Sequence, residues 1–215
     1  MKNRSIALDG PAGAGKSTIA KEIAKLKNLI YIDTGAMYRA VTLKILNAGI
    51  SLENTDAIND ILCDIGIDLD ENDIYLDKKC VTNEIRTPEI NNTVSQVAKI
   101  AQVREKMVQL QRQIADNKDV IMDGRDIGTF VLINANYKFY LTASIKERAH
   151  RRFLELSEKG FDMTLDQVEK DIAARDKNDS EREISPLRKA EDAIEIDSTN
   201  KPIQEVIKEI LSYLK

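Results

Sequence analysis

Cysteine, histidine and tryptophan are scarce in this 215-residue chain, which contains two cysteines, one histidine and no tryptophan. Cys63 and Cys80 have no spacing typical of a metal site or a redox pair, so we expect two reduced thiols packed as small hydrophobic side chains. The only histidine, His150, is expected at the surface, because the sequence offers it no partners for a zinc site or a catalytic triad. These scarcities argue against a disulfide scaffold, a zinc enzyme and a Ser-His-Asp hydrolase.

The chain also lacks a long hydrophobic run and an excess of positive charge. No apolar segment reaches the roughly 18 residues that a membrane span needs, and no apolar signal core precedes the first motif. The formal net charge is −4, whereas a protein that grips nucleic acid usually has a basic excess. We therefore expect a cytoplasmic protein that acts on small molecules and has neither a nucleic-acid nor a membrane partner. Separately, we expect a monomer.

Short apolar runs alternate with amphipathic runs along most of the sequence. Strands are predicted at residues 4–9, 28–33, 118–123, 137–141 and 193–197. Helical spacing of apolar residues occurs at 17–26, 35–48, 94–115, 145–159, 165–175 and 203–214. Strands that alternate with helices predict an α/β fold, with a five-stranded parallel sheet covered by helices on both faces.

One region, residues 65–85, departs from this alternation. It contains three short runs, GIDLD, DIYLD and KCVTNEI, which are separated by polar turn residues. This pattern is typical of an antiparallel meander rather than of a strand–helix unit. We therefore expect a core formed by residues 1–57 and 100–215, with residues 58–99 inserted into it.

The most informative stretch is GPAGAGKS, residues 10–17, which lies between a predicted strand and a predicted helix. Its spacing, G-x-x-x-x-G-K-S, is that of a phosphate-binding loop in which backbone N–H groups and the positive end of a helix surround a phosphate. Lys16 is expected to reach the β and γ phosphates, and the Ser17 hydroxyl to ligate Mg²⁺. A plain glycine-rich turn is the alternative, but it would not need both flanking elements.

We therefore predict a site for a nucleoside triphosphate with Mg²⁺. Its residues would be Gly10, Pro11, Ala12, Gly13, Ala14, Gly15, Lys16, Ser17 and Thr18. The loop alone does not identify the reaction, since ATPases, GTPases and small-molecule kinases share it. A GTPase should have an N-K-x-D motif after a strand, whereas the stretch Asn117-Lys118-Asp119 precedes a strand and has the wrong spacing.

Charged residues follow the carboxyl ends of two predicted strands, where α/β sheets bind their ligands. Arg39 lies one helical turn into DTGAMYRA, and the alternative for it is an exposed helical arginine. In MDGRDIG, Asp123 ends a strand and could hold Mg²⁺ directly or through water. Arg125 and Asp126 follow it in a loop; we favour ligand contact over a surface pair that satisfies itself.

A cluster of arginines occurs in the predicted helix at 145–159. Arg148, Arg151 and Arg152 share one helical face, where they would repel one another unless an anion lay among them. The alternative is a solvated face on which these arginines pair with Glu147 and Glu155.

A second cluster consists of Arg175, Asp179 and Arg182, which share a face only if their helix continues beyond residue 175. An ordinary surface ladder of ion pairs is the alternative for this group. One triphosphate loop together with separate arginine clusters indicates two phosphorylated ligands, and hence phosphoryl transfer, which depends mainly on positioning and charge neutralisation.

Seven stretches, taken in order, resemble those of the bacterial cytidylate kinases, also called CMP/dCMP kinases. They are GPAGAGKST, YIDTGAMYRA, EIRTPE, VSQVAKIAQVRE, DGRDIGT, ERAHRR and ARDKNDSER. The resemblance extends from about residue 5 to residue 199, and DTGAMYRA and DGRDIGT are much more specific than the loop. It implies a P-loop nucleoside monophosphate kinase core, a helical lid at about 148–163 and a monophosphate-binding region enlarged by a small antiparallel sheet, which matches the insert.

The resemblance also implies roles for individual residues. The phosphate of the acceptor would be held by Arg39, Arg125 and Arg182. The cytosine would be recognised by Ser95, Arg104 and Asp126. The sugar would face Arg175 and Asp179. Thr34 would also bind CMP; it stands where many relatives have serine, and it keeps the hydroxyl.

Further residues would act on the donor side by the same resemblance. The lid arginines Arg148, Arg151 and Arg152 would reach the ATP phosphates on closure. Together with Lys16 and the three phosphate-holding arginines they form the predicted catalytic set. The implied reaction is transfer of the γ-phosphoryl group of ATP to CMP or dCMP, in pyrimidine nucleotide metabolism. The alternatives are a kinase of another monophosphate or small anion, and a non-catalytic nucleotide-sensing protein.

Overall fold

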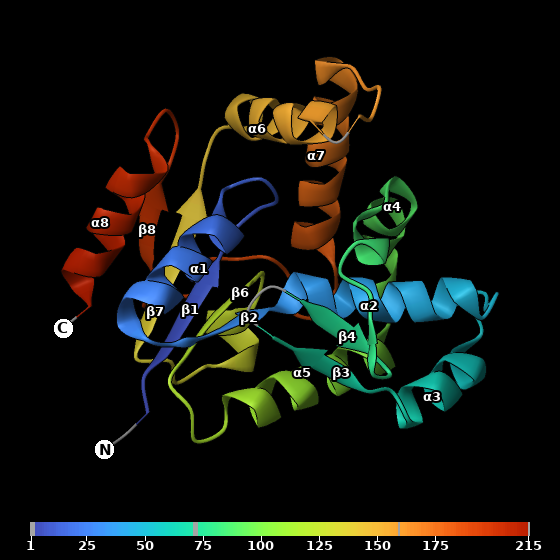
Figure 1. Cartoon of the computed structure of the whole chain (residues 1–215). Coiled ribbons are helices and arrows are strands. Elements are labelled where there is room, and N and C mark those ends of the chain that lie inside the picture. The colour runs from blue at the N-terminus through green and yellow to red at the C-terminus, as the bar shows by residue number, and fades with distance from the viewer. Residues whose placement is uncertain (1–2, 71–72, 159, 215) are drawn as a thin grey trace. The chain divides into compact units, whose positions relative to one another are not determined.

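The computed structural model describes residues 3–70, 73–158 and 160–214. The chain divides into two compact units, one formed by Met1–Tyr31 with Asn117–Lys215 and the other by Ile32–Asp116. Figure 1 shows the helices and strands of each unit. The core and insert boundaries expected from the sequence, 58–99 for the insert, stay a prediction. Residues 71 and 72 of that insert lie outside the described residues.

The main sheet has five strands in the order β2-β6-β1-β7-β8. Four belong wholly to the first unit: β1 (Ser5–Asp9), β6 (Val120–Gly124), β7 (Tyr137–Thr142) and β8 (Ile194–Asp197). The edge strand β2 (Ile30–Asp33) begins in this unit. The pairs β1–β6, β1–β7 and β7–β8 are all parallel. Because central parallel strands are covered on both faces, they are apolar runs such as the fully buried β6. The predicted parallel sheet is confirmed.

Two helices pack with this sheet in a shared hydrophobic core. They are α1 (Lys16–Lys27) and α8 (Ile203–Tyr213). Ile19 and Ile23 of α1 lie in one cluster with Phe139 and Leu141 of β7. Their helical spacing puts them on the buried face, while Lys21, Lys25 and Lys27 occupy the other positions.

The pair α6 (Ile145–Glu158) and α7 (Leu165–Glu181) has a small apolar cluster of its own. Its fully buried members are Ala149, Leu156, Val168 and Ile172. A capping box between Thr164 and Gln167 starts α7. The helix continues six residues beyond the predicted end at residue 175, since no glycine or proline interrupts it there. Lys159, the expected last residue of the preceding helix, lies outside the described residues.

The second unit combines four helices with a small sheet. The helices are α2 (Thr34–Asn47), α3 (Thr55–Cys63), α4 (Pro88–Val97) and α5 (Ala101–Ala115). The strands β3 (Ile67–Leu69), β4 (Ile74–Leu76) and β5 (Lys79–Cys80) pair in order and antiparallel, and the short helix η1 (Glu84–Arg86) follows them. The predicted antiparallel meander is confirmed.

The prediction of one helix over 94–115 is wrong. The structure has α4 and α5 there, with a break at residues 98–100. Ile100 has an extended backbone at φ −71° and ψ 119°, although no glycine or proline marks the break. Thr87 caps α4 and Pro88 occupies its first turn, a start signal that the periodicity alone does not show.

Both cysteines are free, as expected, but the prediction that they pack as buried hydrophobic side chains is wrong. Cys63 ends α3 and Cys80 ends β5, and both are exposed. His150 is exposed on α6, as predicted. Within the described ranges, every helix is too short or too polar to cross a membrane.

Candidate active site

The phosphate loop, residues 10–15, connects β1 to α1 in the conformation that its glycines require. Gly10, Gly13 and Gly15 have φ angles of +146°, +76° and +93°. A Cβ atom on Gly10 would lie 2.0 Å from the carbonyl oxygen of Leu141, and one on Gly13 would lie 3.1 Å from Cβ of Arg148. Other residues would therefore be excluded here by backbone strain and by lack of space.

Lys16, the first residue of α1, is turned toward the loop. Its Nζ donates a hydrogen bond of 2.8 Å to the carbonyl of Pro11, and the residue is only 6% exposed. Burial, aided by the positive charge of Arg125, holds the pKa of Lys16 well below its usual 10.5. A polyphosphate bound in the loop would supply the negative charge that favours the ammonium form.

Ser17 and Asp123 meet beside the loop. The Ser17 hydroxyl donates to Oδ2 of Asp123 at 2.9 Å, and the Tyr31 hydroxyl donates to Oδ1 at 2.9 Å. A hydroxyl and a carboxylate are hard oxygen ligands of the kind that Mg²⁺ prefers, together with water and substrate phosphates. Among the described residues, no three His, Cys, Asp or Glu side chains gather as a metal site. The pair therefore fits Mg²⁺ that arrives with a nucleotide.

Asp9, at the end of β1, is a residue that the sequence reasoning missed. Its two carboxylate oxygens accept the N–H groups of Ile127 and Gly128, each at 2.8 Å. Burial raises the pKa of Asp9 to about 6, although both amides act in the opposite direction. The available signal was an acidic residue directly after the apolar residues Ile6, Ala7 and Leu8 of the predicted strand.

The predicted residues of α7, of its C-cap and of the loop after β6 form a partly buried ionic cluster. Nε of Arg125 donates to Oδ2 of Asp179 at 2.8 Å. Burial alone would raise the pKa of Asp179, but Arg125 and Arg175 hold it below the usual 3.8. Nη2 of Arg182 lies 3.6 Å from Oδ1 of Asp126. Asp179 is only 6% exposed and Arg182 only 8%. These two residues therefore do not belong to a surface ladder of ion pairs, the alternative that the sequence left open.

Arg148 is buried against the phosphate loop. It donates to the carbonyls of Ala143 at 2.9 Å and Ala12 at 3.0 Å, and its Nη2 lies 2.6 Å from Oδ2 of Asp176. The side chain therefore joins the loop, the start of α6 and the later part of α7.

The other two arginines of α6 are paired within the helix. Nε of Arg151 lies 3.0 Å from a carboxylate oxygen of Glu147, and Nη1 of Arg152 lies 2.7 Å from Glu155. Arg151 also donates to the carbonyl of Ser198 at 2.7 Å. Arg151 and Arg152 are thus paired with Glu147 and Glu155 in this structure, which is the alternative that the sequence left open for them.

In the second unit, Thr34 and Arg39 lie in the first turns of α2. Asp33 caps this helix by accepting the N–H of Ala36 at 2.7 Å, and its carboxylate lies 3.6 Å from Nη2 of Arg39. A Cβ on Gly35 would come within 3.3 Å of Nη1 of Arg39. The glycine therefore leaves room for the guanidinium group.

Ser95 and Arg104 lie on α4 and α5, on either side of the break. Arg104 is only 1% exposed, and its guanidinium carbon lies 5.7 Å from the centre of the Tyr38 ring. Its Nη1 donates to the carbonyl of Ala98 at 3.4 Å. A fully buried arginine that contacts an aromatic face and a carbonyl is held in one direction. The second unit thus contains four predicted acceptor-binding residues.

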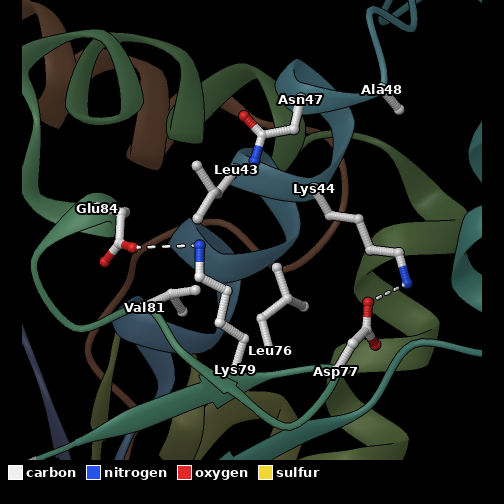
Figure 2. A pocket seen from close by; sticks show the side chains of 9 residues that line it. All are labelled: Leu43, Lys44, Asn47, Ala48, Leu76, Asp77, Lys79, Val81 and Glu84. Atoms are coloured by element: carbon white, nitrogen blue, oxygen red, sulfur yellow. Dashed lines mark hydrogen bonds and ion pairs between the residues drawn. The ribbon is translucent and has the colours of Figure 1, made fainter.

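A separate open pocket of about 530 Å³ lies in the second unit (Figure 2). Its charged side chains face one another in two pairs, Lys44 with Asp77 at 2.6 Å and Lys79 with Glu84 at 3.6 Å. None of the predicted site residues lines it.

A family model described as "Cytidylate kinase" matches residues 6–215. This chain belongs to the cytidylate kinase family. The "Cytidylate kinase" of Clostridioides difficile (strain 630) is 54% identical over 212 residues, which cover 99% of this chain and 98% of that protein. The "Cytidylate kinase" of Alkaliphilus oremlandii (strain OhILAs) is 55% identical over 215 residues, which cover 100% and 99%. The cytidylate kinase resemblance seen in the motifs is confirmed.

Solved structures outside the cytidylate kinase family have the same fold. A gluconokinase from Sinorhizobium meliloti 1021 has a TM-score of 0.51 and 14% identity, with 98% of this chain and 92% of that chain covered. Shikimate kinase from Bacteroides thetaiotaomicron has a TM-score of 0.51 and 12% identity, with 98% of each chain covered. At such identities the likeness concerns the fold alone.

Proposed function

We propose that this chain transfers the γ-phosphoryl group of ATP to CMP, and to dCMP, giving CDP or dCDP and ADP. One observation carries the proposal: in the first unit, the phosphate loop occurs together with the partly buried Arg125–Asp179 pair and with Asp126 beside Arg182. Membership of the cytidylate kinase family supports cytosine nucleotides as acceptors.

The donor would be ATP with Mg²⁺. The loop amides and Lys16 would surround the β and γ phosphates, while Ser17 and Asp123 would hold the metal directly or through water. When bound, Mg²⁺ neutralises charge on the phosphate oxygens.

The acceptor phosphate would be held by three guanidinium groups: Arg39, Arg125 and Arg182. Ser95 and Arg104 suit the N3 and O2 acceptors of cytosine, and Asp126 suits its amino group. Uracil has a carbonyl at that position, so it would leave Asp126 without a donor, and such a mismatch can discriminate strongly. Arg175 and Asp179 would face the sugar.

In the reaction, an oxygen of the CMP phosphate attacks the γ-phosphorus in line, and the bond between that phosphorus and the leaving ADP oxygen breaks. Since the second phosphate pKa is near 6, this oxygen is largely deprotonated at pH 7 and needs no general base. Arg151 and Arg152 would exchange Glu147 and Glu155 for ATP phosphates as the helix pair closes. Closure would exclude water, which would otherwise accept the phosphoryl group. We further propose a monomer located in the cytoplasm.

Acceptor-dependent ADP release tests the proposal. ATP and Mg²⁺ are supplied with CMP, dCMP, UMP, AMP or shikimate in separate reactions, and the K16M variant is the control. We expect the highest kcat/KM with CMP or dCMP and no turnover with K16M. Faster release with AMP or shikimate would identify another kinase. Slow hydrolysis that no acceptor accelerates would favour a nucleotide-sensing role.

A further inference from the structure

Asp9 makes an unusual pair of contacts with the loop that follows β6. Its Oδ1 accepts the N–H of Ile127 and its Oδ2 that of Gly128, each at 2.8 Å. The carboxylate is only 4% exposed. Because both of its oxygens are used by consecutive amides, the carboxylate fixes both the place and the direction of this main chain.

These two amides open the short helix η2 (Ile127–Val131), in which the first N–H groups have no acceptor within the helix. The residue before a helix usually supplies that acceptor from its own side chain. Here this residue is Asp126, and its side chain makes no such hydrogen bond. Asp9 caps η2 from strand β1 instead, and the carboxylate of Asp126 lies toward Arg182, with 3.6 Å between Oδ1 and Nη2.

A side chain at position 128 would lie between Asp9 and Lys138. A Cβ on Gly128 would lie 3.4 Å from Oδ2 of Asp9 and 3.1 Å from Cδ of Lys138. Gly128 is not among the residues with positive φ, so alanine is compatible with its backbone. The glycine therefore leaves room for the side chain of Lys138 rather than providing an unusual backbone conformation.

We propose that Asp9 is a positioning residue for recognition of the base. Its carboxylate sets the main chain of residues 126–128, and thereby the direction in which Asp126 meets the amino group of cytosine. The inference rests on the proposed function. Asparagine cannot replace aspartate here, because one amide N–H would face the N–H of Ile127 or Gly128.

The test compares wild type with D9N for CMP and for UMP. We expect D9N to lower kcat/KM for CMP at least tenfold and to narrow the CMP/UMP ratio of kcat/KM at least fivefold. A purely structural role would lower the melting temperature or the active fraction, which affects both substrates alike. If D9N had the same CMP/UMP ratio of kcat/KM as wild type, the inference would be overturned.

The matched control is D119N. Asp119 also accepts a backbone N–H, that of Arg4 at 2.8 Å, but at the opposite end of the sheet and outside the predicted site. We expect D119N to keep the wild-type CMP/UMP ratio, and a ratio narrowed as far as in D9N would also overturn the inference.

A second variant decides the matter if D9N does not fold, as judged by circular dichroism. D9A removes both acceptor oxygens without adding an opposing N–H, and it should narrow the CMP/UMP ratio at least twofold; an unchanged ratio in folded D9A would contradict the inference. Absence of CMP-dependent ADP release by wild type would instead remove the proposed function, and this inference with it.

Discussion

Replacing Asp9 should change how the stability of the protein depends on pH. Burial raises the pKa of this carboxyl group to about 6 in the folded state, against 3.8 as its ordinary value. At a pH between these two pKa values, the folded state binds more protons than the unfolded state. The free energy of unfolding that Asp9 contributes is therefore greatest at acid pH and is lost as the pH rises through about 6. At about 1.36 kcal/mol per pKa unit, the loss amounts to about 3 kcal/mol.

Urea unfolding of wild type and D9N between about pH 4 and pH 7.5 measures this contribution, because the other titrating groups are common to both proteins. The stability of wild type minus that of D9N should decrease by about 2 kcal/mol across the range, because at pH 4 the unfolded carboxyl group is already more than half ionised. For Asp119 the change of stability with pH has the opposite sign. Hydrogen bonds from the backbone N–H and side chain of Arg4 lower the pKa of Asp119 below 3.8, so its contribution is lost only at more acid pH. A difference for D9N that stays constant or grows with pH would refute the reasoning.

Three substitutions test the proposed roles of individual residues. K16M should abolish turnover while circular dichroism stays unchanged, since the phosphates lose their ammonium partner; a near-normal kcat would contradict the loop assignment. R39A should cost about 2–5 kcal/mol in kcat/KM for CMP, the range for unpairing a desolvated charge, whereas a loss below threefold would indicate a surface residue. D126N should narrow the preference for CMP over UMP in steady-state assays, and an unchanged ratio would show that another group recognises the base.

The sheet and the phosphate loop could be predicted because their signals are local. A buried strand is an apolar run, and glycines at fixed spacing identify a loop whose backbone has positive φ at Gly10, Gly13 and Gly15. The cap of α2 by Asp33 is likewise a contact between near neighbours. Each of these features depends on a few adjacent residues.

The remaining features depend on contacts between distant parts of the sequence. Asp9 caps a helical turn that starts 118 residues later. The carboxylate of Asp176 neutralises Arg148 from the next helix, so repulsion among neighbouring arginines could not predict its burial. The break between α4 and α5 has no glycine or proline, and the periodicity of its apolar residues suggested one continuous helix. Local patterns do not report such tertiary effects.

The contacts of Arg148 have a mechanical consequence for the helix pair α6 and α7. Arg148 joins the start of α6 to the main chain of the phosphate loop and to Asp176, and Arg125 holds the same part of α7 through Asp179. Both anchors lie at one end of the pair, whereas Phe161 and Met163, which follow α6, pack against the small cluster of the pair itself. A swing of the two helices would therefore pivot about Arg148, with the widest arc at Phe161 and Met163 and a direct pull on the carbonyl of Ala12.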